Sequence, residues 1–229
     1  MPVAAREAEA LARGLASLGP YFEVTLRPDG EAPAPPWRPM SELVDGGDAL
    51  RERVDVVRSV LAQRAGLAAS GVEARVAASV AQLGLVARLV SPYVGAAVLT
   101  GPAPQPPSLD DAWWQPLTGG AFPVCLPVRG LLGPEATPAP ETAAALRAGL
   151  VDGPVAQLVD AVRQSFDVST TVLWGNVGSA VNAVAVVAAA SRPDLATRTR
   201  DVVRQVLDHP LLRVPGDGLG RRTGGAAAA

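Results

Sequence analysis

The stretch TVLWGNVGSAVNAVAVVAAAS, from Thr171 to Ser191, contains no charged residue but places Asn176, Ser179 and Asn182 among alanines and valines. The charge-free segment around it, 168–191, has 24 residues, a length that can cross a bilayer. Its hydroxyl and amide groups, its weakly hydrophobic alanines and the lack of flanking aromatic and basic clusters favour a buried helix instead. We therefore expect no membrane span.

The polar residues of this helix form a stripe. At about 100° per residue, Asn176, Ser179 and Asn182 lie within one arc of about 120°. Gly175 and Gly178 border the arc, so another helix or a ligand can approach the backbone closely. A buried amide needs partners, because an unsatisfied one costs roughly 1–3 kcal/mol. The stripe therefore predicts either bonds to neighbouring helices or contact with a bound molecule.

An earlier predicted helix, 72–90, carries a matching stripe. Arg75, Ser79 and Gln82 fall within about 60° of one another, and Arg88 lies on the opposite side. Two opposed polar faces indicate that one meets solvent and the other meets the interior. If the stripe with Ser79 and Gln82 faces the uncharged helix, the two helices line a polar pocket in an apolar body. If not, Arg75 is a residue of the pocket rim.

Hydrophobic periodicity and turn residues predict an α+β fold that is predominantly α-helical, with a small antiparallel sheet. A break at Ser91-Pro92 is expected to end the 72–90 helix and start a shorter run to Thr100. We divide the chain into an N-terminal helix and strand region, a helical domain and a disordered tail, at 1–66, 67–213 and 214–229. The other expected elements are helices at 6–18, 47–65 and 193–208, two helical pieces hinged near 153–154, a strand at 22–26, and a hairpin near 113–126.

Composition excludes several kinds of chemistry. All 20 basic residues are arginine, so a Schiff-base lysine and a Walker A phosphate loop are ruled out. Cys125 and His209 are the only residues of their kinds, which rules out an internal disulfide and the four-cysteine and paired-histidine metal sites. We expect neither a metal nor a cofactor. The net charge of −2 predicts no nucleic-acid binding, and we expect a cytoplasmic protein because no signal segment is visible.

Two segments carry a resemblance to a known family. The sequences RVAASVAQLGLVARLVSP (75–92) and VLWGNVGSAVNAVAVVAAASRPDL (172–195) are similar to those of FhuF-type ferric siderophore reductases. The resemblance covers roughly 67–212, including the region around Trp113 and Trp114. Its most specific part is W-G-N-x-x-S-A, at 174–180.

The resemblance implies a cytoplasmic protein that handles bulky ferric siderophores. Members of the family reduce the iron with a 2Fe–2S cluster held by four C-terminal cysteines, which follow an arginine-rich segment. In this chain Arg221 and Arg222 stand at that segment, but TGGAAAA follows and the four cysteines are missing. The resemblance therefore predicts a scaffold without its electron carrier, and iron reduction by this chain alone is not expected.

Other candidate groups have structural explanations as well. Cys125 with His209 as its base is one pair, although a single buried cysteine is usually a packing residue. The carboxylates of Asp110 and Asp111 precede a tryptophan pair and fit either a pocket entrance or a solvated turn.

Three hypotheses follow. The first is a cluster-free relative of the siderophore reductases that binds a siderophore or another specialised metabolite in a buried, polar-lined pocket. The second is a cofactor-independent cyclase or isomerase. The third is a scaffold subunit for a separate redox protein. We expect a small organic molecule as ligand, and a second copy or a redox protein as partner. The candidate ligand-binding residues are Trp174, Asn176, Ser179, Asn182, Arg75, Ser79, Gln82 and Trp114.

Overall fold

The structure, a computed structural model, describes residues 3–101, 104–106, 108–117, 120–132 and 137–213. The predicted tail, 214–229, lies outside this part of the chain. The helices are α1 (Val3–Leu18), α2 (Ala49–Ala65), α3 (Ala74–Thr100), α4 (Ala139–Leu146), the π-helical segment η4 (Arg147–Val155), α5 (Ala156–Phe166), α6 (Thr170–Ser191) and α7 (Ala196–Leu207). The strands are β1 (Thr25–Arg27), β2 (Arg38–Pro39), β3 (Trp113–Trp114) and β4 (Val124–Pro127).

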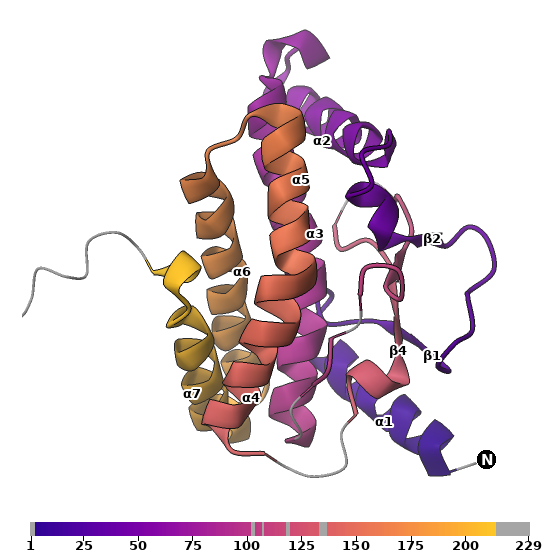
Figure 1. Cartoon of the computed structure of the whole chain (residues 1–229), viewed down its shortest axis with the longest axis vertical. Coiled ribbons are helices and arrows are strands. Elements are labelled where there is room, and N and C mark those ends of the chain that lie inside the picture. Colours follow the sequence, from indigo (N-terminus) through magenta and orange to yellow (C-terminus); the bar gives the residue numbers. More distant parts are fainter. Residues whose placement is uncertain (1–2, 102–103, 107, 118–119, 133–136, 214–229) are drawn as a thin grey trace, which may run out of the picture.

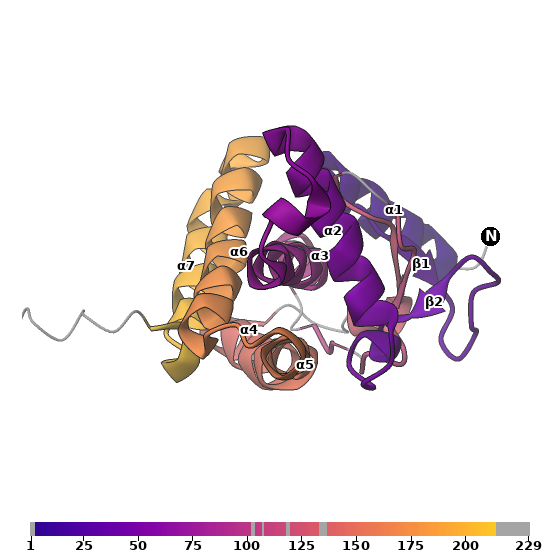
Figure 2. The same cartoon turned by 90° about the horizontal axis from the view of Figure 1, so that it is seen from above.

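Helix α3 runs through the centre of the molecule (Figure 1). Figure 2 shows α6 and α7 on one side of it, α4 and α5 on a second, α2 on a third, and the strands with α1 on the fourth. Every residue in the segment 88–98 is buried. A helix that is covered all round is mostly apolar all round, which explains the hydrophobic side chains that dominate the sequence after Arg88.

The small sheet has the strand order β1-β4-β3-β2. Strands β3 and β4 form the predicted hairpin, in which Trp113 pairs with Cys125 and Trp114 with Val124. Strand β1 lies parallel to β4, with Thr25 opposite Cys125, so the sheet is mixed and not purely antiparallel. The predominantly helical α+β fold is confirmed.

The predicted break at Ser91-Pro92 is wrong, because α3 continues through Pro92 to Thr100. Proline inside a helix removes one N–H group and crowds the preceding turn, at a cost of about 3 kcal/mol. Here Val90 and Val94 are buried on either side of the proline. Tertiary packing of the surrounding turns offsets the local cost, and the helix stays continuous.

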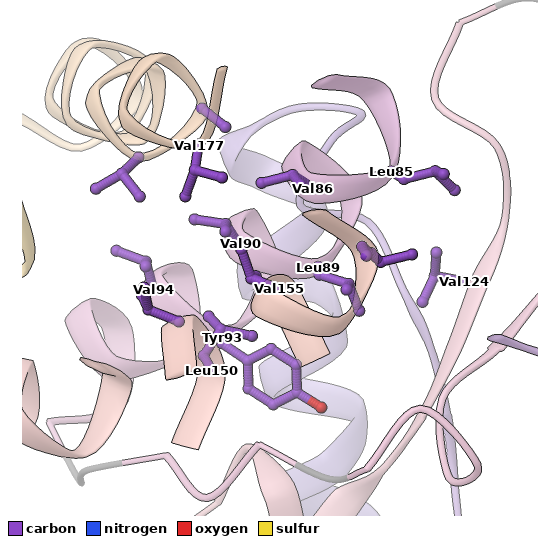
Figure 3. Close-up of a cluster of buried hydrophobic side chains, with 14 of the residues drawn as sticks. Leu85, Val86, Leu89, Val90, Tyr93, Val94, Val124, Leu150, Val155 and Val177 are labelled. Carbon is purple, nitrogen blue, oxygen red and sulfur yellow. The ribbon is translucent and has the colours of Figure 1, made fainter. Parts of the chain in front are cut away.

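Figure 3 shows how α3 packs against its neighbours: Val86 and Val90 of α3 lie beside Val177 of α6, and Val90 also lies beside Val155 of η4. Branched side chains of this kind fill the interior with few lost conformations. This part of the contact between α3 and α6 is therefore apolar and close-packed.

Glycine allows α1 to approach α3 closely. A Cβ atom on Gly95 would lie 2.8 Å from Cδ1 of Phe22 and 2.9 Å from Cδ2 of Leu15, closer than real Cβ atoms come to such neighbours. Gly95 thus fixes how the first 22 residues lie on the central helix.

The hinge expected near Gly153-Pro154 is present. The backbone of Gly153 is non-helical, with φ −100° and ψ −113°, and it interrupts η4 just before α5 begins. The kink turns the chain so that α4 contacts α7, while α5 lies along α3.

One hydrophobic cluster contains residues from Leu11 to Leu212. Side chains of the predicted N-terminal region and of the predicted helical domain both pack in it. At the predicted division, Gly66 ends α2 in a left-handed conformation with φ 67°.

The interpretation of the helix with two polar faces placed Arg88 on the solvent side. In the structure Arg88 does not face solvent. It is buried in the core, and its guanidinium group donates only to backbone carbonyls. Nε bonds the carbonyl of Phe122 (2.8 Å), Nη1 those of Pro20 (3.2 Å) and Tyr21 (2.5 Å), and Nη2 that of Glu23 (2.7 Å).

Burial lowers the pKa of Arg88 to about 10, because the charged form is removed from water. The carbonyl dipoles compensate part of that cost, since charge-assisted hydrogen bonds are stronger than neutral ones. Arg88 thereby ties the hairpin and the chain between α1 and β1 to the middle of α3.

Tyr93 is another buried polar residue of α3. Its hydroxyl makes no hydrogen bond to the described part of the protein. Burial raises the pKa of Tyr93 well above its ordinary value, with a smaller contribution in the same direction from Asp111.

We expect Arg88→Met to lower the free energy of unfolding by at least about 3 kcal/mol, because it leaves several carbonyls without donors and removes a charge-assisted network. Urea denaturation measures this loss. Arg75→Met on the same helix is the control, because Arg75 is exposed and its loss should stay within about 0.5 kcal/mol. Equal losses in both variants would contradict the structural role of Arg88.

Tyr93→Phe should leave the free energy of unfolding unchanged or raise it by about 1 kcal/mol, because it removes a buried hydroxyl without a protein partner. The unfolded tyrosine ionises near pH 10, whereas the folded one keeps its proton to higher pH. Tyr93 therefore makes stability fall as pH rises above about 10. Denaturation curves on both sides of pH 10 should show a smaller fall in the variant, and destabilisation at neutral pH would contradict this account.

Candidate functional site

The structure brings three of the predicted site residues together between α3 and α6. Nδ2 of Asn176 lies 3.0 Å from Oγ of Ser79, 3.1 Å from its backbone carbonyl and 2.9 Å from Oε1 of Gln82. Nε2 of Gln82 in turn lies 3.4 Å from the carbonyl oxygen of Leu173. The two polar stripes therefore meet at Asn176.

This arrangement is a hydrogen-bonded lock between helices. Gln82 is completely buried, and both the oxygen and the nitrogen of its side-chain amide make a hydrogen bond. Neither of the two hollows described below is lined by Asn176, Ser79 or Gln82. The polar groups at this point satisfy one another, which is the first of the two alternatives that the sequence left open.

Three further predicted residues lie away from this lock. Arg75 is exposed and pairs with Glu73, with 2.6 Å between Nε and Oε2. Trp174 is buried in the core. Trp114 is buried as well, and its Nε1 donates to Oε1 of Glu42 at 2.9 Å. Both tryptophans act here as large core residues, and Trp114 has a satisfied N–H group.

Ser179 and Asn182 face a different neighbour. They line a groove of about 1230 Å³ between α6 and α7. Both side chains are exposed, and Ser179 Oγ donates to the carbonyl of Gly175 at 2.9 Å. We call this hollow the α6–α7 groove. The residues that give it its chemistry are Gly175, Gly178, Ser179 and Asn182 of α6, Arg200, Asp201 and Arg204 of α7, and Asp208 and Arg213 beyond it.

Two glycines leave part of the α6 side of the groove without side chains. Cβ atoms built on Gly175 and Gly178 would meet nothing within 4 Å. The backbone of α6 is thus open to the groove at two points one turn apart, between side chains that can donate and accept hydrogen bonds.

Arginines dominate the opposite wall. Arg204 contacts Asp201 (Nη2 to Oδ1, 3.4 Å), Arg200 bonds the carbonyl of Ala196 through Nε at 3.2 Å, and Nε of Arg213 donates to the carbonyl of Asp208 at 3.0 Å. These contacts occupy only part of each guanidinium group, which carries five N–H donors. The remaining donors suit carboxylate, phenolate or hydroxamate oxygens.

Sequence analysis missed the arginines of α7. Arg200 and Arg204 are four residues apart and therefore lie on one helical face, together with Thr197 and Asp208. This spacing was a detectable signal. What the sequence did not show is that this face meets the polar stripe of α6, because that depends on how the two helices pack.

Cys125 and His209 do not form a catalytic pair. Cys125 is buried on β4, and burial raises the pKa of its thiol, which disfavours the reactive thiolate. The N–H of Leu211 donates to Nδ1 of His209 at 3.3 Å, so the proton of the neutral ring sits on Nε2, 2.9 Å from Oδ1 of Asp152. His209 thus caps the turn η6 (Pro210–Leu212).

The aspartates before the tryptophan pair separate. Asp110 lines a smaller hollow of about 440 Å³, together with Asp160, Gln157 and Gln164 of α5. Asp111 instead contacts Arg27 and Arg129. Neither tryptophan lines the smaller hollow.

Two further properties bear on function. In the described residues no group of three or more His, Cys, Asp or Glu side chains is placed to hold a metal ion. By length and composition alone, α3 and α6 could each cross a membrane; 72 % of the most apolar window is buried in α3 and 39 % in α6.

Comparison of the chain with known protein families, curated proteins and solved structures gave no match. The resemblance to siderophore reductases therefore rests on the quoted sequence segments.

The two asparagines of α6 should respond differently to substitution by leucine. Asn176→Leu removes the donor to Ser79 and Gln82 and should lower the free energy of unfolding by about 1–3 kcal/mol. Asn182 is exposed, so Asn182→Leu should change it by less than about 0.5 kcal/mol. Thermal or urea denaturation without ligand measures both. If Asn182→Leu destabilises the protein as much as Asn176→Leu, the two roles assigned here are wrong.

Proposed function

We propose that this protein binds a siderophore or another specialised metabolite with anionic, oxygen-rich groups in the α6–α7 groove. The observation that carries the proposal is the meeting of Ser179 and Asn182 with Arg200 and Arg204 across one open hollow. This differs from a buried pocket between α3 and α6, where the polar groups bond one another.

The two walls offer complementary chemistry. Guanidinium groups bind carboxylate-type oxygens through paired N–H donors, and the amide of Asn182 can donate or accept. Leu207 and Leu212 add apolar surface to the same hollow. Small-molecule sites commonly combine apolar lining with a few polar groups that fix orientation. A bulky, multiply oxygenated ligand matches this combination better than a purely apolar one.

The volume of the groove supports a bulky ligand. Pockets for drug-sized molecules span roughly 300–1,000 Å³, and the groove, at about 1230 Å³, is larger and open to solvent. A ferric siderophore is a compact molecule of this size range. The resemblance in 172–195 supports the same ligand class, because that segment forms the α6 wall.

We propose binding and not reduction of iron. The chain has no cysteine at the C-terminal positions where the resembling family holds its cluster, and Cys125 is buried on β4. The protein would then hold or deliver the metabolite, and any electron transfer would fall to another protein.

Titration with defined ligands tests the proposal. The probes are ferric complexes of a catecholate, a hydroxamate and a hydroxycarboxylate siderophore, each with its iron-free form, followed by calorimetry. We expect saturable binding of at least one probe. Arg204→Ala should weaken it at least tenfold, about 1.4 kcal/mol, because a charge-assisted hydrogen bond is lost. Ser179→Leu should weaken it by filling the groove.

Arg163→Ala is the matched control, because Arg163 is an exposed arginine of α5 outside the groove. Mass spectrometry of the recovered probe distinguishes binding from chemical conversion. Absence of binding by every probe, or binding that the groove variants leave unchanged, would overturn the proposal.

A further inference from the structure

Two glycines of α6 are not explained by the packing of the protein. A Cβ atom on Gly175 or Gly178 would meet nothing within 4 Å, whereas one on Gly95 would collide with its neighbours. Glycine inside a helix is less stable than alanine, because it loses more conformational freedom on folding. Helix α6 therefore gives up some stability at two positions that line the α6–α7 groove.

The two glycines lie at an apolar end of the groove. After the turn at 192–195, α7 runs back along α6, so the end of α7 lies beside the first half of α6 (Figure 1). Leu207, at the end of α7, and Leu212, in the turn η6, line the groove together with the glycines. Because the N–H and C=O groups inside a helix bond one another, the bare backbone of α6 adds few free polar groups here.

Arginines stand next to this apolar end. Arg204 precedes Leu207 by three residues and lies on the same side of α7. Arg213 follows Leu212 directly. In all, three arginines and two aspartates line the groove, an excess of one positive charge. A guanidinium group can bind anionic oxygens in pairs, and it can also stack on the face of an aromatic ring.

These neighbours together favour a flat ligand group. An aromatic ring has an apolar face that can lie on bare helix backbone, where any larger side chain would hold it away. Its edge can carry anionic oxygens for the arginines. A hydroxycarboxylate such as citrate offers the same oxygens but no flat apolar face. It would leave the surface between the glycines and the two leucines to water.

We propose that the ligand of the α6–α7 groove carries an aromatic ring with anionic oxygens, of the salicylate or catecholate type. The ring lies flat over Gly175 and Gly178, and its oxygens point toward Arg204. This inference rests on the proposed function and narrows its ligand class from oxygen-rich metabolites to aromatic ones. The two glycines then determine specificity, because they leave the space that the ring occupies.

Titration of the full chain with salicylate, followed by nuclear magnetic resonance of the backbone amides, tests the position of the ring. We expect saturable shifts of the Gly175 and Gly178 signals, because the ring lies against their backbone. The comparison probe is 2-hydroxycyclohexanecarboxylate, which has the same charge and substituents on a ring that is not flat. It should bind at least tenfold more weakly than salicylate.

Substitution of the glycines separates binding from folding. Gly178→Ala should weaken salicylate binding at least tenfold, because the methyl group occupies the place of the ring. The same change should raise the Tm by about 1–4 °C, since alanine favours the helix and its Cβ meets no neighbour. Gly84→Ala is the matched control. Gly84 also lies inside a helix with open space around its Cβ, but outside the groove, so this variant should bind salicylate like wild type.

Salicylate that does not bind wild-type protein, or that binds Gly178→Ala as tightly as wild type, would overturn the ring site. The siderophore titration separates this result from failure of the proposed function. If a hydroxamate or hydroxycarboxylate probe binds and depends on Arg204 while salicylate does not bind, the metabolite site stands and its aromatic specificity is wrong. If no siderophore probe and no salicylate binds, both proposals are wrong.

Discussion

Neighbouring elements enclose the second half of helix α3 on every side. This enclosure decides which contacts the other elements make with α3. Water cannot reach the segment 88–98, so each polar group there needs a partner from another element or stays unsatisfied. Arg88 draws in the hairpin and the chain after α1. At the end of the helix, Arg198 of α7 donates to the carbonyls of Ala97 and Gly101, which the last turn leaves without partners inside the helix.

Arginine is well suited to bonding buried backbone carbonyls, and the chain has no lysine. Arg27, Arg53, Arg88, Arg147 and Arg198 each donate to backbone carbonyls of residues that belong to other parts of the fold. A flat guanidinium group with five donors can bind several carbonyls at once, which an ammonium group does less well. The Cζ atoms of Arg53 and Arg88 also lie over the ring of Phe122, 4.9 and 5.8 Å from its centroid. The bonds of Arg53 and Arg88 join the hairpin region to α2 and α3 through backbone carbonyls.

Much of the fold could be predicted from the sequence because local signals were strong. Gly66 and the Gly153-Pro154 hinge marked element ends correctly, since each depends on nearby residues alone. Pro92 gave the wrong signal, because its local cost is outweighed by packing that involves distant segments. The same reason limits the prediction of the site. Asn176 could be expected to need partners, but the identity of those partners depends on the parallel arrangement of α3 and α6. The parallel pairing of β1 with β4 also arises only in three dimensions.

The uncharged helix carries polar residues because two neighbours flank it. The stripe spans an arc of about 120°, and its two edges face different neighbours. Asn176, at one edge, bonds α3, and Asn182, at the other edge, opens toward α7. Ser179 lies between them and bonds its own helix. Asparagine therefore stabilises the contact between helices at position 176 and leaves its amide open to the groove at position 182. A charged side chain at position 176 would be costly in the buried contact with α3. A carboxylate at position 182 would pair with the arginines of α7, whereas a neutral amide suits both positions.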